Sequence, residues 1–205
     1  MAGEIAHTIY AARLLTHIGD DVSDPSYWIG ALFPDIYRIG RTSRYPTHPR
    51  SVSLSTIVGN NDFVTGMRVH SWIDDTREKY FREHSALEKL SWHPLLPFAF
   101  ELFEDEILYG SYDDWGHITA ILSTIHADEE LLIHNRPHIQ AWHALLANYF
   151  RAAPDDTSRR IFMEKLQIPS AIIQEVNGVV ADLKANDTAQ EILMDYIRSI
   201  EHILL

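Results

Sequence analysis

Apolar residues recur at helical spacing along almost the whole chain, while the strict apolar–polar alternation that marks strands is nearly absent. Ile5, Ile9, Ala12 and Leu15, for example, fall on one face of a helix. Glycine, proline and capping residues separate the periodic segments. This pattern predicts an all-α protein of about seven to nine helices.

The expected helices follow one another with little between them. They cover approximately residues 5–19, 27–32, 62–81, 94–110, 114–133, 138–150, 157–166, 169–184 and 188–205. Residues 36–61 are rich in Gly, Pro, Ser and Thr and are expected to form a loop. With 205 residues and no repeat, we expect residues 1–205 to form a single α-helical domain.

Composition narrows the classes of function. The net charge of −12 argues against sequence-independent binding to nucleic acid or to anionic membranes. Because the chain has no cysteine, any metal ion must be held by His, Asp and Glu. There is no apolar run of the ~20 residues that a membrane span needs, so we expect no stable membrane insertion. The N-terminal residues lack signal-peptide features, and we expect a cytoplasmic protein.

The segment HSWIDDTREKYF, residues 70–81, places His70 and Asp74 one helical turn apart. Residues four apart share a helix face, about 6 Å along the axis, so both side chains can reach one ion. The simpler alternative is the polar edge of an ordinary helix. Glu101 and Asp105 repeat the spacing within a very apolar helix, where two unpaired acids would be costly to bury. The alternative there is a solvent-facing position shared with Glu104.

Three further residues could add metal ligands. His7 lies in the first helix, Asp35 follows a proline at a turn, and His48 stands between two prolines in a loop. Each also has a simpler interpretation: a hydrogen-bonded core histidine, a turn cap or a stiffened loop residue. The segment containing His126, Asp128, His134, His138 and His143 is interpreted as a solvated, histidine-rich surface.

Four arginines gather between residues 38 and 50, where the overall composition would place about one Lys or Arg. They are Arg38, Arg41, Arg44 and Arg50. Arginine forms forked contacts with phosphate or carboxylate groups, so the cluster predicts an anionic substrate. The alternative is pairing with the nearby acids Asp20, Asp21 and Asp24. Motifs for nucleotide binding or a serine nucleophile are absent.

Taken in order, the stretches AHTIYAA, WIGALFPDI, THP and FVTGMRVHSWIDD resemble the zinc-dependent phospholipase C family. AHTIYAA, IGALFPDI, GMRVHSWIDDTREKYFREHSALEKL and FEDEILYGSYDDW are also similar to acyl-carrier-protein phosphodiesterase, a relative of the HD phosphohydrolases. Both families are α-helical metallohydrolases acting on phosphoesters. The resemblance covers roughly residues 5–115, which would carry the metal site. Residues 116–205 resemble nothing known and are expected to complete the bundle.

The resemblance implies a set of metal ligands. One ion would be held by Asp35, His48, His70 and Asp74, and a second would lie near His7, Asp74 and Asp105. The expected cofactor is a divalent metal, most simply zinc, although mixed imidazole and carboxylate ligands also suit manganese or iron.

These observations predict a metal-dependent phosphohydrolase that acts on a small phosphoester or on a phospho group attached to a carrier. Metal-bound water would attack phosphorus, Arg41 and Arg44 would neutralise phosphate oxygens, and Glu101 or Asp75 would orient the water or act as a base. One alternative is a non-catalytic helical binding module on the same scaffold. Another is a metallohydrolase with a non-phosphate substrate. The amphipathic C-terminal helix would pack on its own core or on a second subunit, giving a homo-oligomer.

Overall fold

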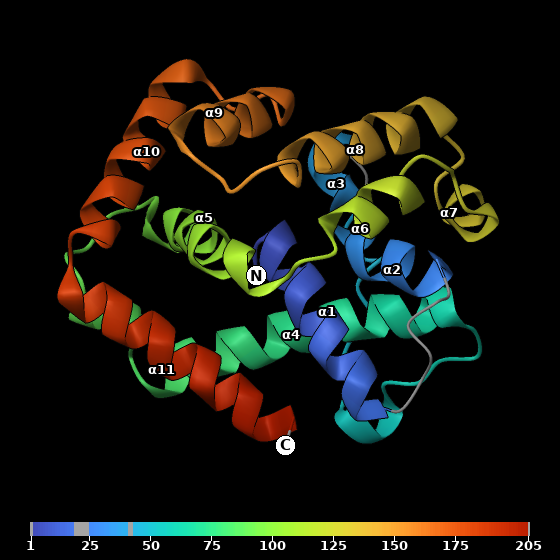
Figure 1. Cartoon of the computed structure of the whole chain (residues 1–205), viewed down its shortest axis with the longest axis horizontal. Coiled ribbons are helices and arrows are strands. Elements are labelled where there is room, and N and C mark those ends of the chain that lie inside the picture. Colours follow the sequence, from blue (N-terminus) through green and yellow to red (C-terminus); the bar gives the residue numbers. More distant parts are fainter. Residues whose placement is uncertain (1, 19–24, 41–42, 205) are drawn as a thin grey trace.

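The computed structural model describes residues 2–18, 25–40 and 43–204, and every regular element in these ranges is helical. Figure 1 shows the eleven α-helices found there. They are α1 (Glu4–Ile18), α2 (Pro25–Leu32), α3 (Tyr37–Gly40), α4 (Asp62–Glu83), α5 (Leu96–Leu108), α6 (Trp115–Ile121), α7 (Ala127–Leu132), α8 (Arg136–Tyr149), α9 (Asp156–Lys165), α10 (Ser170–Lys184) and α11 (Asp187–Leu204). Short 3-10 helices are η1 (Pro34–Ile36), η2 (Leu54–Thr56), η3 (Leu87–Lys89) and η4 (Tyr109–Ser111).

The all-α class is confirmed, and the helix count is higher than expected for two reasons. The segment 36–61, expected to be a loop, contains the short helices α3 and η2. The single helix expected over 114–133 is two helices, because the chain turns at residues 122–126 and His126 caps α7 through a hydrogen bond from the Asp128 amide. Asp155, and not Asp156 or Thr157, caps α9.

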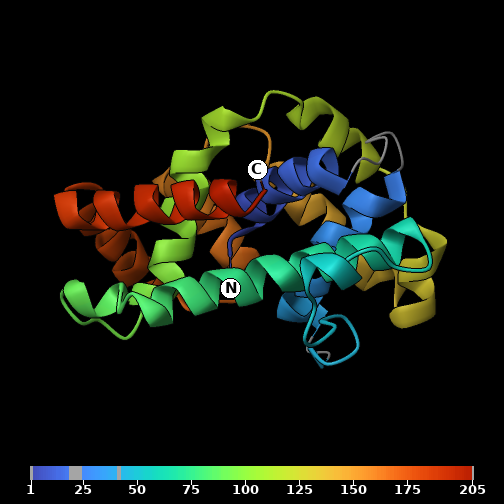
Figure 2. The same ribbon diagram turned by 90° about the horizontal axis from the view of Figure 1, so that it is seen from below.

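The long helix α4 forms one side of the molecule, and α1, α2 and α11 pack against it (Figure 2). Helix α5 packs against α1 and against α10, and Arg77 of α4 donates a hydrogen bond to Glu104 of α5 at 2.8 Å. Helix α8 contacts α3, η1, α6 and α9. The buried apolar side chains belong to one cluster that extends from Ala2 to Ile200. None of the described helices is both long enough and apolar enough to span a membrane.

Helices α2 and α4 touch backbone to backbone through two glycines. A Cβ atom on Gly30 would lie 2.1 Å from the Phe63 carbonyl oxygen, and one on Gly66 would lie 2.1 Å from that of Tyr27. Only glycine tolerates this approach. It brings the carboxyl end of α2, and the η1 turn that follows, against the middle of α4.

Candidate metal centre

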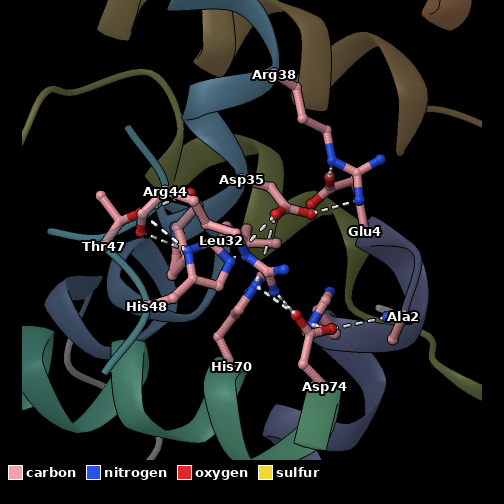
Figure 3. Close-up of polar contacts among 12 residues, drawn as sticks. Ala2, Glu4, Leu32, Asp35, Arg38, Arg44, Thr47, His48, His70 and Asp74 are labelled. Carbon is pink, nitrogen blue, oxygen red and sulfur yellow. Dashed lines mark hydrogen bonds and ion pairs between the residues drawn. The ribbon is translucent and has the colours of Figure 1, made fainter. Parts of the chain in front are cut away.

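Five of the residues expected to bind metal converge in the interior (Figure 3). His7 comes from α1, Asp35 from η1, His48 from the loop before α4, and His70 and Asp74 from α4. Four are buried; His48 is partly exposed. They reach one place because α1 and α2 both pack on α4.

The donor atoms have the spacing of ligands around a cation. His70 Nε2 lies 3.8 Å from Asp35 Oδ1 and 3.9 Å from Asp74 Oδ2. His48 Nε2 lies 3.4 Å from Asp35 Oδ1, and His7 Nε2 lies 3.3 Å from Asp74 Oδ1. Ligands placed tetrahedrally at zinc distances are about 3.3–3.6 Å apart. Two triplets, His7–His70–Asp74 and Asp35–His48–His70, have all their donor atoms within 4.8 Å of one another.

Second contacts orient two of the imidazole rings. His70 Nδ1 lies 2.9 Å from the Ala31 carbonyl oxygen, and His48 Nδ1 lies 3.2 Å from that of Arg44. Since a carbonyl oxygen only accepts hydrogen bonds, Nδ1 of His70 carries the proton, and its Nε2 presents a lone pair to the centre, which is the arrangement that metal-binding histidines adopt. His48 Nδ1 also lies 3.0 Å from the Thr47 hydroxyl, which fixes the orientation of the ring.

Several buried polar atoms at the centre make no well-aligned hydrogen bond with any residue in the described ranges. They include Nε2 of His7, His48 and His70 and Oδ1 of Asp35, whereas Asp35 Oδ2 is paired with Arg38. Leaving such a buried group without a partner costs about 1–3 kcal/mol each. A cation would satisfy them together, so these residues fit a divalent metal ion.

The protonation states suit metal binding as well. Burial first, and the neighbouring His7 second, lower the pKa of His70 to about 3. The rings of His7 and His70 stack at 3.7 Å between centroids, which places His7 directly against the neutral His70 ring. Burial alone would raise the pKa of Asp35 and Asp74, but Arg38 beside Asp35 and His7 beside Asp74 outweigh it and hold both pKa values well below the ordinary range. The structure thus presents neutral His70 and ionised aspartates.

Glu4 is a candidate ligand that the sequence analysis missed. It forms a third triplet with His7 and Asp35, again within 4.8 Å. Neither carboxylate oxygen makes a well-aligned hydrogen bond with a described residue. Burial, followed by the charge of Asp35, raises the pKa of Glu4 well above its usual value. The sequence does contain a signal for this ligand, because Glu4 precedes His7 by one helical turn and so lies on the same face of the helix.

Glu101 and Asp105 have separate environments within α5. The expectation that they share the solvent face with Glu104 is wrong, because all three are buried. Asp105 Oδ1 accepts a hydrogen bond from the Ala6 amide at 2.9 Å, and Oδ2 accepts one from the Tyr149 hydroxyl at 3.2 Å. Asp105 thereby binds the first turn of α1 and stands outside the three triplets. Glu101 lies 3.7 Å from Arg38.

An open pocket of about 650 Å³ lies beside the centre, between the 43–51 loop and α4. Arg44 and Arg50 line it together with His48 and Asp74. Arg44 is 43% exposed, and its Nη2 lies 2.5 Å from Asp74 Oδ2. Of the two candidate bases, exposed Asp75 lines this pocket and Glu101 does not.

Arg38 does not line this pocket. It is mostly buried, with 11% of its side chain exposed, and its Nη2 is 2.7 Å from Asp35 Oδ2. Arg41 is outside the described residues, as are Asp20, Asp21 and Asp24, the proposed pairing partners of the cluster.

The histidine-rich segment is not uniformly solvated, which corrects the sequence-based interpretation. His143 is buried, with Nδ1 3.0 Å from the Leu122 carbonyl oxygen and Nε2 2.8 Å from Glu129 Oε1. His134 is exposed, and His126 and His138 are partly exposed. The buried pair joins α8 to α7 and to the preceding turn.

Comparison with known proteins adds no relative: the chain matches no protein-family model, no curated protein and no solved structure. The function is therefore argued from the site and from the sequence motifs.

Proposed function

We propose that this protein is a metal-dependent phosphoester hydrolase. The observation that carries the proposal is the convergence of His7, Asp35, His48, His70 and Asp74 on one buried place, where Nε2 of all three histidines makes no hydrogen bond with a described residue. The spacing of the donor atoms and the neutral state of His70 support a divalent ion there.

In this proposal, His70 is the central ligand, with Asp35 and His48 on one side and Asp74 on the other. His7 contacts Asp74 and would complete or orient that ligand. A divalent ion bound here would supply a water molecule of lowered pKa as the nucleophile. Zinc, manganese and iron all suit the donor set.

The substrate would enter through the pocket beside the 43–51 loop. The guanidinium groups of Arg44 and Arg50 line that pocket, and they would bind phosphate oxygens and neutralise their growing charge. Asp75 lies on the opposite wall and would position or deprotonate the attacking water. The pocket's open side is compatible with a phosphoester on a small molecule or on a carrier. The motifs shared with the phospholipase C and HD-related hydrolases support the same chemistry.

One observation favours a second candidate, a non-catalytic binding module. Arg44 pairs with Asp74, so one ligand carboxylate has a cationic partner without any metal ion. In that case the arginine-lined pocket would bind an acidic partner and no reaction would follow.

Elemental analysis of the protein purified without added metal separates the two. We expect near-stoichiometric zinc, manganese or iron in the wild type and none in Asp74→Asn. Asp75→Asn is the matched control, because this neighbouring carboxylate is exposed and should leave the metal content unchanged. A panel of phosphomonoesters, phosphodiesters and carboxylic esters should show phosphoester hydrolysis that Asp74→Asn abolishes.

Two other results of these experiments would each refute a part of the proposal. A wild-type protein that stays metal-free after incubation with all three metals would refute the metalloenzyme and favour the binding module. A metal-loaded protein that hydrolyses only the carboxylic esters would refute the phosphoester assignment and keep the hydrolase.

A further inference from the structure

Arg38 lies inside the protein, among carboxylates. Its side chain is 11% exposed, with Nη2 2.7 Å from Asp35 Oδ2 and 3.7 Å from Glu101 Oε2, and Nε 4.0 Å from Glu4 Oε1. In Figure 3 it reaches Glu4 and Asp35 from the side opposite Arg44. The pocket beside the metal centre is not lined by Arg38, so a phosphate there would be bound by other residues.

The carboxylates around Arg38 include two members of a possible ion site. Glu4, His7 and Asp35 offer three donor atoms within 4.8 Å of one another. Glu4 and His7 are 2% and 0% exposed, and neither makes a well-aligned side-chain hydrogen bond with a described residue. This triplet shares His7 and Asp35 with the metal centre, so an ion bound there would be next to the first.

The balance of charge at the centre indicates whether the Glu4–His7–Asp35 triplet can hold a second metal ion while Arg38 is present. A single divalent ion, with the guanidinium groups of Arg38 and Arg44, supplies four positive charges, and the four carboxylates around the centre can supply at most four negative ones: Glu4, Asp35, Asp74 and Glu101. Another divalent ion would leave a buried excess of positive charge beside Arg38, which a low-dielectric interior opposes.

We propose that Arg38 is a resident cation that closes the Glu4–His7–Asp35 triplet to metal, so that the centre binds ions only on its His70 side. The inference rests on the metal centre of the proposed function, and it makes Arg38 a determinant of ion number. Substrate would not contact it. Removing the guanidinium should therefore create a site that the wild type lacks.

The test counts Mn²⁺ ions bound to metal-free, full-length protein by equilibrium dialysis and elemental analysis. Arg38→Met should bind one equivalent more than the wild type, with a spin-coupled electron paramagnetic resonance signal because the two ions are close. Arg38→Lys keeps a cation and should bind the wild-type number. Arg13→Met is the matched control, because it removes an arginine paired with Glu201 at 2.8 Å and should change nothing.

Adding Glu4→Gln to Arg38→Met should abolish the extra ion. If Arg38→Met does not fold, the double variant Arg38→Met/Glu101→Gln takes its place in the test. It removes one positive and one negative buried charge, so the net charge of the interior is unchanged. A folded variant of either kind that binds no more Mn²⁺ than the wild type overturns the proposal.

Glu4→Gln alone tests the same idea in an otherwise native centre. In the wild type Arg38, whose Nε lies 4.0 Å from Glu4 Oε1, keeps metal away from this carboxylate, so metal affinity should not change. A loss of the ~10–100-fold that even indirect supporting residues can cause would show that Glu4 already binds metal and would overturn the proposal. A wild type that binds no Mn²⁺ refutes the proposed function. The role of Arg38 is measured separately, by the difference in the number of bound Mn²⁺ ions between the variant and the wild type.

Discussion

Asp74 and Asp105 are both buried aspartates, yet their surroundings favour opposite protonation states. Asp74 faces His7, His70 and Arg44, and its pKa is held well below the usual range. Asp105 has no cationic partner among the described residues, and burial, only partly offset by the hydrogen bond from Ala6, raises its pKa to about 7. The first is suited to binding metal, and the second to holding a proton at the start of α1.

Asp105 should make stability depend on pH. Its folded-state pKa exceeds the unfolded value of about 3.9, so its stabilising contribution is complete below about pH 4 and is lost as pH rises through 7. Asp105→Asn removes this loss. Relative to the wild type, its free energy of unfolding should rise by on the order of 2–3 kcal/mol between about pH 5 and pH 8. Urea denaturation in metal-free buffer measures the difference.

Asp155→Asn is the control for that titration. The hydrogen bond from the Ser158 amide lowers the pKa of this exposed helix cap, so its contribution is lost only as pH falls below the ordinary aspartate range. The free energy of unfolding of Asp155→Asn should change with pH in the same way as that of the wild type over the same pH interval. A parallel course for Asp105→Asn as well would show that Asp105 is ionised throughout.

The pairs His70/Asp74 and Glu101/Asp105 show what an i,i+4 spacing in the sequence can and cannot predict. The spacing correctly placed His70 and Asp74 on one face of α4, and it did the same for Glu101 and Asp105 on α5. Only the packing distinguishes the pairs. His70 and Asp74 meet His7 from α1, whereas Asp105 meets the backbone of α1 and Glu101 approaches Arg38.

At the scale of elements, the contact between α2 and α4 sets the geometry of the centre. Asp35 follows α2, and the Ala31 carbonyl oxygen near the end of α2 accepts the His70 hydrogen bond. Any increase in the separation of the two helices would move both groups. The glycines at this contact therefore help to position the candidate metal ligands.

Gly66→Ala should disrupt that contact. Its Cβ would lie 2.1 Å from the Tyr27 carbonyl oxygen, so the helices must move apart, at a cost of about 1–3 kcal/mol or more. We expect a lower free energy of unfolding together with weaker metal binding, measured by denaturation and by metal titration.

Gly178→Ala provides a matched comparison. Gly178 is also inside a helix, α10, but no atom lies within 4 Å of the position of its Cβ. Alanine should stabilise the helix there by about 0.5–1 kcal/mol and leave metal binding intact. If the two variants behaved alike, close backbone contact would not be the reason for Gly66.

Local signals located most helix ends but missed the turn between α6 and α7. Asn61, Asp114 and Pro169 flank helices as expected. The turn was missed because Leu122 and Ile125 continue the apolar period of α6 while packing on the core from a non-helical segment. An apolar period reports which side faces the interior, and it does not require an unbroken helix.

At the scale of the molecule, residues 116–205, for which we found no sequence resemblance, contact the elements that carry the candidate metal ligands. Trp142 in α8 donates a hydrogen bond to the Leu32 carbonyl oxygen at 3.0 Å, just before the turn that carries Asp35. Tyr149 in the same helix contacts Asp105. The final helix α11 packs on α1, α4 and α10 of its own chain.

Metal binding should stabilise the whole fold, because its ligands come from separate parts of the chain. An ion at about 1,000 times its Kd would add about 4 kcal/mol, and a chain of this size gains roughly 2–4 °C in Tm per kcal/mol. We therefore expect saturating metal to raise Tm by roughly 8–16 °C over chelator-treated protein in thermal unfolding. Asp74→Asn should show almost none of this shift, and an equally small shift in the wild type would contradict the metal centre.

The sequence by itself determined the helical class, most helix boundaries and the residue types able to bind a cation, because periodicity and capping are local properties of the chain. Tertiary packing alone decided that His7 meets Asp74, that Glu4 joins the cluster, and that Arg38 points inward while Arg44 lines the pocket. These contacts join residues distant in sequence, and they depend on how closely α1 and α2 approach α4, which no local pattern encodes.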